Sequence, residues 1–237
     1  MFKKDIPGEV LVVGLPAFLM TFCENLSYFL LDANIALVST SEIISTASLA
    51  GVGAAKKVNM FAHSIARGMT QGVLPLIGYN KSSGKRVRMR KIFFTATGIT
   101  CGISLICMTI NICAAGQLCS IFSLNQDALD LAKQYLIIFS IGAPFSAFAY
   151  SVISFFQAVG KAWRSLILAL LRKGIFDIPL MYILPLIPVM NYIPGAAVVW
   201  ATPIADIVCC LVAIVLLTYY IKRHCKVDKE EMVTQNN

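Results

Sequence analysis

Long apolar stretches alternate with short polar segments along the whole chain, and this alternation predicts helices that cross a lipid bilayer. A helix needs about 20 apolar residues to cross a hydrocarbon core of roughly 30 Å. Six stretches meet this requirement, at residues 10–38, 46–79, 90–115, 131–157, 165–188 and 195–221. The first two are longer than a bilayer needs, so we expect tilt, kinks or extension beyond the membrane.

The pattern therefore predicts an all-α, polytopic membrane protein built as a six-transmembrane-helix bundle. Residues 1–9 are expected to form a cytoplasmic segment, residues 10–222 the bundle, and residues 223–237 a disordered cytoplasmic tail. The polar loop at 116–130 is expected to hold a short surface segment. Composition agrees, because 58% of the residues are hydrophobic and only 14% are charged, whereas roughly a quarter are charged in a water-soluble domain.

Basic residues gather in alternate loops, and this predicts the orientation of the helices. Six of them, and no acid, lie between Lys81 and Lys91. Others precede the first predicted helix and follow the fourth and the sixth, whereas the loops near Glu42, Asp127 and Asn191 contain no Lys or Arg. The positive-inside rule then places both termini in the cytoplasm of a multi-pass protein of the plasma (inner) membrane. Topology thus explains the net charge of +8, and we expect the lipid bilayer, not nucleic acid, as the partner.

Ionisable side chains recur at similar depths in the predicted helices. At a rise of 1.5 Å per residue, the side chains in one broad central layer are Glu24, Arg67, Asp177 and Asp206, with His63 one turn from Arg67. A charge that faces lipid there costs at least roughly 2.5–3.5 kcal/mol, so these groups should face the bundle interior or a watery cavity. One interpretation is an ion- or proton-coupled pathway for a polar or cationic solute. The other is that Arg67 neutralises Asp177 or Glu24 in a packed interior.

Other polar residues have simpler interpretations. Arg172 and Lys173 are expected to reach the cytoplasmic headgroups with their long side chains, and Asp32 and Lys56–Lys57 to reach the outer interface. His63 is interpreted first as a hydrogen-bonded helix contact, with a proton relay as the alternative. A set of aromatic residues could line a site for flat cationic drugs, although packing and lipid contact are the default for most: Phe22, Tyr28, Phe29, Tyr135, Phe148, Tyr150, Phe155 and Phe156.

The motifs of enzymes and of ATP-driven proteins are missing from the sequence. It contains no HExxH, GxSG or GxGD of intramembrane proteases and no GxxxxGK[ST] loop. Four cysteines recur at a six-residue spacing (Cys101, Cys107, Cys113 and Cys119), with no CxxC and no histidine at ligand spacing. We interpret them as small packing residues and expect neither enzyme activity, metal site nor cofactor.

The most specific motif lies in the second predicted helix and the loop that follows. The segment Gln71–Asn80 reads QGVLPLIGYN and is followed by Gly84 and Arg88. It resembles the "QG..P..GYN…G…R" signature of multidrug and toxic compound extrusion (MATE) transporters. Gly14 and Pro16 resemble the "GLP" that opens the seventh helix of that family.

Further motifs follow in the family's order. Gln157 and Gly160 lie in a segment similar to its "QA.GKA" loop, and residues 172–180 and 200–206 are similar to its helices eleven and twelve in clostridial-type members. The resemblance covers roughly residues 3–222.

The resemblance implies structural roles for most of these residues. Gly72 and Gly78 would permit close helix contact, Pro75 would kink the helix, and Gly84 would allow a tight turn. Asn80, Gln157 and Gly160 are grouped with them as fold-maintaining residues. Gln71 alone is a candidate for substrate contact.

The resemblance also implies a function. Members of the family resemble a pair of six-helix lobes that face a central cleft, and this sequence corresponds to the second lobe only. We therefore expect the C-terminal half of a cation-coupled multidrug antiporter, driven by H⁺ or Na⁺, that exports organic cations or other xenobiotics by alternating access. It is either a fragment or needs an N-terminal six-helix lobe or self-association, and is expected to be inactive without one.

Departures from the family pattern bear on the coupling ion. Glu24 matches a glutamate that some members carry on helix seven, whereas residues 136–157 contain no acid to match a helix-ten carboxylate. Two other functions remain open: a non-transporting membrane remnant or assembly partner, and a flippase for lipid-linked sugars.

Overall fold

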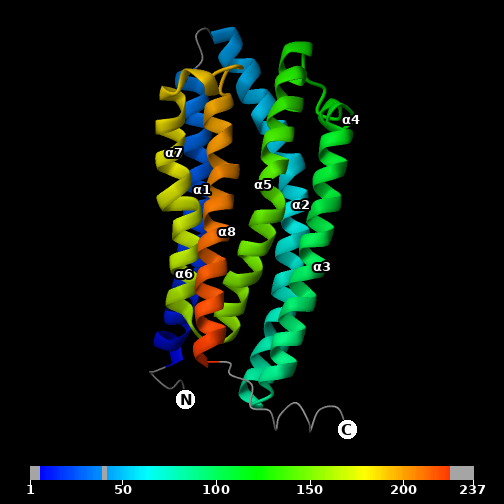
Figure 1. Ribbon diagram of the computed structural model, residues 1–237. Coiled ribbons are helices and arrows are strands. Elements are labelled where there is room, and N and C mark those ends of the chain that lie inside the picture. The colour runs from blue at the N-terminus through cyan, green and yellow to red at the C-terminus, as the bar shows by residue number, and fades with distance from the viewer. Residues whose placement is uncertain (1–5, 39–41, 225–237) are drawn as a thin grey trace.

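The computed structural model describes residues 6–38 and 42–224, and every regular element within these ranges is helical (Figure 1). The all-α membrane fold predicted from the sequence is therefore confirmed. The elements are α1 (Ile6–Val38), α2 (Glu42–Ser82), α3 (Arg86–Cys113), α4 (Ala115–Ser120), α5 (Gln126–Ala158), α6 (Ala162–Leu170), the π-helical turn η1 (Leu171–Phe176), α7 (Asp177–Ile183), the 3-10 turns η2 (Leu184–Leu186) and η3 (Pro188–Met190), and α8 (Ala196–His224).

The elements form a bundle of roughly parallel and antiparallel rods. Helices α1, α2, α3, α5 and α8 are single rods, and α6, η1 and α7 continue into one another as a further, composite rod (Figure 1). Helix α4 is the short segment expected in the loop at 116–130.

Helix α5 lies at the centre of the bundle and packs against α2, α3 and α8. Three of the described helices, α3, α5 and α8, are both long and apolar enough to cross a membrane. The most apolar stretch of α5 is 72% buried inside the protein, against 22% for α3 and 39% for α8. The faces of α3 and α8 that remain uncovered are those available to lipid.

Two apolar clusters fill the bundle, one toward each end. The first contains Leu31, Tyr135 and Val198, and the second contains Phe156 and Tyr220. Between them, α5 and α8 place polar residues in the interior. The two clusters therefore enclose a central polar layer, which holds the candidate site.

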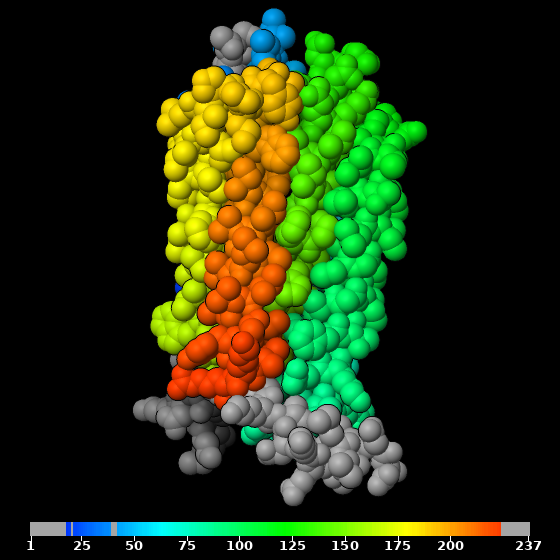
Figure 2. Space-filling model, viewed as in Figure 1, coloured from blue at the N-terminus to red at the C-terminus, as the bar shows by residue number. Residues whose placement is uncertain are grey.

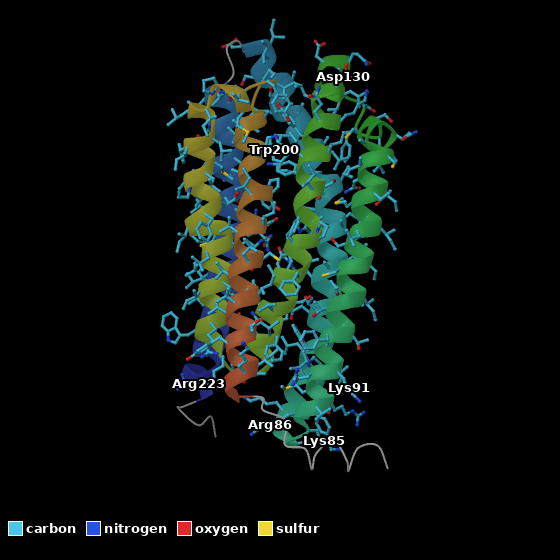
Figure 3. All side chains as sticks on the ribbon, viewed as in Figure 1. Lys85, Arg86, Lys91, Asp130, Trp200 and Arg223 are labelled. Carbon is cyan, nitrogen blue, oxygen red and sulfur yellow. The ribbon has the colours of Figure 1, made fainter. Side chains whose placement is uncertain are left out.

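Basic side chains mark one end of the bundle. Lys85, Arg86, Lys91 and Arg223 lie at this end, whereas Asp130 lies at the other (Figure 3). The first residues of α1 and the last residues of α8 lie at the basic end (Figure 1). This distribution is what an even number of crossings produces.

The ends of the first and last helices differ from the sequence prediction. Helix α1 begins at Ile6, inside the segment 1–9 that was assigned to the cytoplasm, and α8 continues through Arg223 to His224, inside the predicted tail. The remainder of that tail lies outside the described residues. Apolar periodicity sets the centre of a membrane helix well but not its polar ends.

The MATE-like motif residues have distinct positions. Gly84 and Gly160 have φ angles of +73° and +68°, a conformation that favours glycine. Lys81 donates a hydrogen bond to the Val159 carbonyl and thereby ties the two motif-bearing turns together. Asn80 is buried and donates to the Leu76 carbonyl at 2.8 Å.

The prediction of close helix contact holds for one of the two glycines. A Cβ at Gly78 would meet the Ala158 carbonyl oxygen at 3.6 Å, whereas a Cβ at Gly72 would meet nothing within 4 Å, so the prediction for Gly72 is wrong. Pro75 lies inside α2 and removes the N–H that would bond to the Gln71 carbonyl, yet the helix continues to Ser82. Gly14 and Pro16 lie within α1, but their side chains are outside the described set.

Candidate ion and substrate site

Six ionisable side chains, three acidic and three basic, form the central polar layer. They come from α1, α2, η1, α7 and α8, and five of them are buried. The acids are Glu24, Asp177 and Asp206, and the bases are Arg67, Arg172 and Lys173. Each acid accepts a hydrogen bond from one of the bases. The layer is therefore balanced in charge when all six groups are ionised.

The first ion pair joins α1 to α2. One terminal nitrogen of Arg67, Nη2, lies 2.7 and 2.6 Å from the two carboxylate oxygens of Glu24. The same nitrogen donates to the Tyr150 hydroxyl at 2.8 Å, and this hydroxyl donates to Glu24 Oε1 at 2.9 Å. Tyr150 of α5 thus closes a three-residue ring of hydrogen bonds. Of the two partners proposed for Arg67 from the sequence, the structure shows Glu24 and not Asp177.

The second ion pair joins the π-helical turn to α8. Arg172 Nε donates to Asp206 Oδ1 at 2.6 Å, and the side chains are only 3% and 2% exposed. The guanidinium lies 4.2 Å from the centre of the Tyr150 ring, within range of a cation–π contact. Tyr150 therefore contacts both arginines, Arg172 through its ring and Arg67 through its hydroxyl and, at 5.1 Å from the ring centre, through its ring as well.

The third ion pair lies within the composite rod. Lys173 Nζ donates to Asp177 Oδ2 at 2.9 Å, and Asp177 also accepts hydrogen bonds from Ser27 and Thr202. The ammonium lies 5.1 Å from the centre of the Tyr28 ring. Asp177 is fully buried, and its contacts connect α1, the composite rod and α8.

The prediction that Arg172 and Lys173 reach the cytoplasmic headgroups is wrong. Both are buried, 3% and 4% exposed, and both pair with acids. The π-helical turn has a wider hydrogen-bonding pattern than an α-helix, and it presents these two adjacent residues to different partners. Both charged groups have hydrogen-bond partners inside the protein, so neither side chain needs to extend to the interface.

A further ion pair lies in the half of the bundle nearer Asp130. Lys56 Nζ lies 2.5 Å from Asp32 Oδ1, and the side chains are 14% and 43% exposed. The prediction treated these residues as independent groups that reach for the interface, whereas the structure pairs them with each other. Lys57, the next residue, is exposed.

His63 and Gln71 flank Arg67 on α2. His63 Nδ1 lies 3.2 Å from the Ser146 hydroxyl, and its ring makes an edge contact with Tyr150 at 6.2 Å. This geometry is that of a hydrogen-bonded helix contact. Gln71 is exposed, one turn beyond Arg67.

One face of the bundle carries exposed polar residues at membrane depth. Helices α1 and α2 lie behind α5 and α8 in the view of Figure 1, and the space-filling view of the near face shows mainly α3, α5, α6 to α7 and α8 (Figure 2). Exposed polar positions on α1 and α2 include Asn25, Ser64 and Gln71. The exposed positions of α3 and α8 are predominantly apolar, for example Ile106 and Val215, whereas α1 and α2 expose these polar residues together with apolar ones such as Phe22 and Met60. Lipid contact suits α3 and α8, whereas the face of α1 and α2 suits water or another protein surface.

Two members of the central layer were not recognised in the sequence as site residues. The Lys173–Asp177 pair has the i,i+4 spacing of a helix pair, a signal that could have found it. The Arg172–Asp206 pair joins positions 34 residues apart. Arg172 lies in the π-helical turn, where the 3.6-residue period of an α-helix does not hold, so periodicity does not tell which way it points.

Taken together, the fold and the central layer define a polytopic membrane lobe with a charged interior next to one polar face. The family model MatE matches residues 16–183, which is more than half of the chain, and the chain belongs to this family of MATE transporters.

Curated relatives extend the match beyond the family model. The chain is 29% identical over 231 residues to "Multidrug export protein MepA" of Staphylococcus saprophyticus, covering 97% of this chain and 48% of the relative. It is 25% identical over 234 residues to the protein of the same name from Staphylococcus aureus strain MSSA476, covering 98% and 48%. The chain thus spans about half the length of the curated relatives that it matches.

Solved structures support the fold. An outward-facing multidrug resistance MATE family transporter of the MOP superfamily superposes with a TM-score of 0.84 at 18% identity, covering 96% of this chain and 49% of the other. The MATE transporter ClbM in complex with Rb⁺ gives a TM-score of 0.78 at 21% identity, covering 90% and 47%. At these identities the likeness concerns the fold alone.

Proposed function

We propose that this chain acts as one lobe of a cation-coupled multidrug antiporter, with Glu24 as the ion-binding carboxylate. The observation that carries the proposal is the Glu24–Arg67–Tyr150 ring, which places a carboxylate at membrane depth directly behind the polar face of α1 and α2. The relatives are multidrug export proteins, and this supports the substrate class.

The proposed mechanism uses competition for Glu24. A proton or sodium ion that binds the carboxylate weakens its hold on a cationic group of the drug, and the drug in turn excludes the ion. This competition gives the two conformations of the transporter different affinities, which alternating access requires. Asp177 and Asp206, each held by a buried base, serve in this scheme to fix η1 and α8 around the site.

A second six-helix lobe completes the proposed transporter. The polar face of α1 and α2 would border the cleft between the lobes, and the two lobes would rock against each other about it. The basic loop at Lys81–Lys91 and both ends of the chain would lie in the cytoplasm of a cell whose plasma membrane holds the protein.

The test is reconstitution in liposomes with and without a first lobe, with proton and sodium gradients imposed separately. We expect gradient-driven movement of a cationic dye only when a first lobe is present, and loss of coupling in Glu24→Gln. Robust transport by the chain as a monomer would contradict the need for a second lobe, and unchanged coupling in Glu24→Gln would contradict the role of Glu24.

The assembly-partner alternative has one observation in its favour, the complete pairing of the buried acids. A lobe whose charges serve only to hold the helices together would show the same pairs. It would give no gradient-dependent response of any dye, whichever lobe it is combined with.

A further inference from the structure

Arg67 is the most accessible member of the central layer. Its side chain is 38% exposed, whereas that of its partner Glu24 is 11% exposed. Asp177 and Asp206 are essentially inaccessible, at 0% and 1%. A solute that approaches from the face of α1 and α2 therefore meets the Arg67 side chain before it meets any of the three acids.

The guanidinium also has unused hydrogen-bonding capacity. A single nitrogen, Nη2, makes all the side-chain bonds described for Arg67, two to Glu24 and one to Tyr150. The Nε atom is buried and has no hydrogen-bond partner. A guanidinium carries five N–H groups in a planar fork that matches a carboxylate with two parallel bonds. The contact with Glu24 does not use this fork.

The charge balance of the layer limits which solutes can enter. A purely cationic group that took Glu24 away from Arg67 would leave Arg67 without a counter-ion, in the same layer as Arg172 and Lys173. Separating one partner of a buried pair is costly because it leaves an uncompensated charge. A solute that carries both a cationic and an acidic group avoids this cost, because it replaces one internal ion pair by two new ones.

We propose that Arg67 is a specificity-determining residue that binds an acidic group of the solute while Glu24 binds its cationic group. The substrate class is zwitterionic aromatic amphiphiles with a carboxylate or sulfonate. This inference rests on the proposed function and deepens it, since a proton or sodium ion still competes with the cationic group for Glu24. The exposed aromatic ring of Phe22, on the same helix as Glu24, offers the apolar part of such a solute a surface.

The test uses two dyes that differ at one position: a xanthylium dye with a free carboxylate, which is a zwitterion, and its methyl ester, which is a cation. Binding to the purified full chain in lipid nanodiscs is measured by fluorescence anisotropy, with and without a first lobe. We expect the free acid to bind about tenfold more tightly than the ester, the effect of one charge-assisted hydrogen-bonded pair.

Variants distinguish recognition from a structural role. In Arg67→Gln the preference should vanish or reverse, because Glu24 is then free to bind the cationic ester. Arg67→Lys, which keeps the charge but not the fork, should give an intermediate preference, and Glu24→Gln should weaken binding of the ester more than of the acid. Lys57→Gln, which alters an exposed base on the same helix, is the matched control and should keep the wild-type ratio.

Two results would overturn the inference: an ester that binds as tightly as the acid in the wild-type chain, or a ratio that is unchanged in a folded Arg67→Gln. These outcomes are separable from failure of the proposed function. A dye preference that depends on Arg67 without gradient-driven transport contradicts the antiporter alone, whereas coupled transport that depends on Glu24 without a dye preference contradicts the role of Arg67 alone.

Discussion

At the scale of single residues, the buried acids are stabilised by specific partners. Two ions buried together pay a large desolvation cost, which good geometry offsets only while both partners are present. The Arg172–Asp206 pair is the most completely buried of the pairs, whereas Lys133 and Asp130, at the end of α5, form a pair that is 34% and 55% exposed. The two pairs allow the effect of burial to be measured within one protein.

We predict that Asp206→Asn destabilises the protein by about 3–5 kcal/mol, because it leaves Arg172 charged and unpaired in the interior. Asp130→Asn, the matched change at the exposed pair, should have little effect on stability, because solvent screens that pair. The measurement is the free energy of unfolding in mixed micelles. The double variant Arg172→Leu with Asp206→Leu should recover much of the loss, and a double variant as unstable as Asp206→Asn would argue against charge imbalance as the cause.

The Tyr150 hydroxyl supports a second prediction. Tyr150→Phe keeps the ring beside Arg172 but removes the hydroxyl shared by Glu24 and Arg67. We expect a loss of about 1–3 kcal/mol of stability and a weaker dependence of transport on the ion gradient. Tyr28→Phe is the control, since no hydrogen bond of the Tyr28 hydroxyl is seen within the described residues and the change keeps the ring that contacts Lys173 and Lys56. Equal effects of the two changes on coupling would speak against a special role of Tyr150.

The residues of the site were only partly predictable from the sequence. Depth along a helix follows from counting residues, and it correctly placed Glu24 and Arg67 in one layer. Direction around a helix follows from polar periodicity, and the π-helical turn interrupts that periodicity in the composite rod. Arg172 was therefore assigned to the interface, although the structure turns it toward α8.

At the scale of the elements, α5 and α8 approach each other closely at one glycine. A Cβ at Gly142 would lie 3.0 Å from the Pro203 Cα and 3.2 Å from Asp206 Oδ2. Glycine at such a crossing lets the backbones of membrane helices come together. The same contact sets the distance between α5, which carries Tyr150, and α8, which carries Asp206.

We predict that Gly142→Ala destabilises the protein by about 1–3 kcal/mol, because the added methyl group overlaps with backbone atoms of α8 and displaces the Asp206 carboxylate. Gly98→Ala in α3 is the matched control, since a Cβ there meets nothing within 4 Å. It should be neutral or stabilising by up to about 1 kcal/mol, the difference in helix propensity between alanine and glycine. Thermal unfolding of both variants in the same detergent would test the contrast, and equal midpoints would contradict close packing at Gly142.

The π-helical turn could not be predicted from the local sequence. The segment Leu171–Phe176 contains no proline, and its one glycine, Gly174, has open space around its Cβ position. The turn is favoured by the pairs that it makes possible, Arg172 with α8 and Lys173 with Asp177. Its cause is tertiary, so local propensity does not indicate it.

At the scale of the whole molecule, the sequence predicted the order of the long helical rods, and three of them, α3, α5 and α8, are long and apolar enough to cross a membrane. It did not predict which helix is central or which faces meet lipid, because those depend on contacts between distant segments. The structure places α5 at the centre and leaves polar residues exposed on α1 and α2. Thiol labelling can test both the orientation of the chain in the membrane and the surroundings of these helix faces.

We predict that single cysteines introduced at four positions react with a membrane-impermeant maleimide in a fixed pattern, in a background where the eight native cysteines are replaced. Ser123→Cys, at the end of the bundle away from the basic residues, should react in intact cells. Ser83→Cys, beside the basic loop, should react only after the membrane is opened, because the positive-inside rule places that loop in the cytoplasm. Reaction of Ser83→Cys in intact cells would invert the orientation.

The two remaining positions test the faces at mid-depth, where thiol reactivity requires water because only the thiolate reacts. Ser64 is exposed on α2 and Ile106 is exposed on α3. Ser64→Cys should react with the maleimide when the chain is combined with a first lobe in the conformation whose cleft opens to the reagent, whereas Ile106→Cys should remain unreactive throughout because lipid covers α3. Since both side chains are exposed in the isolated lobe, a difference in their rates would come from the surroundings of each face. Equal protection of the two thiols would mean that α1 and α2 face lipid, and Glu24 would then have no route to an aqueous ion.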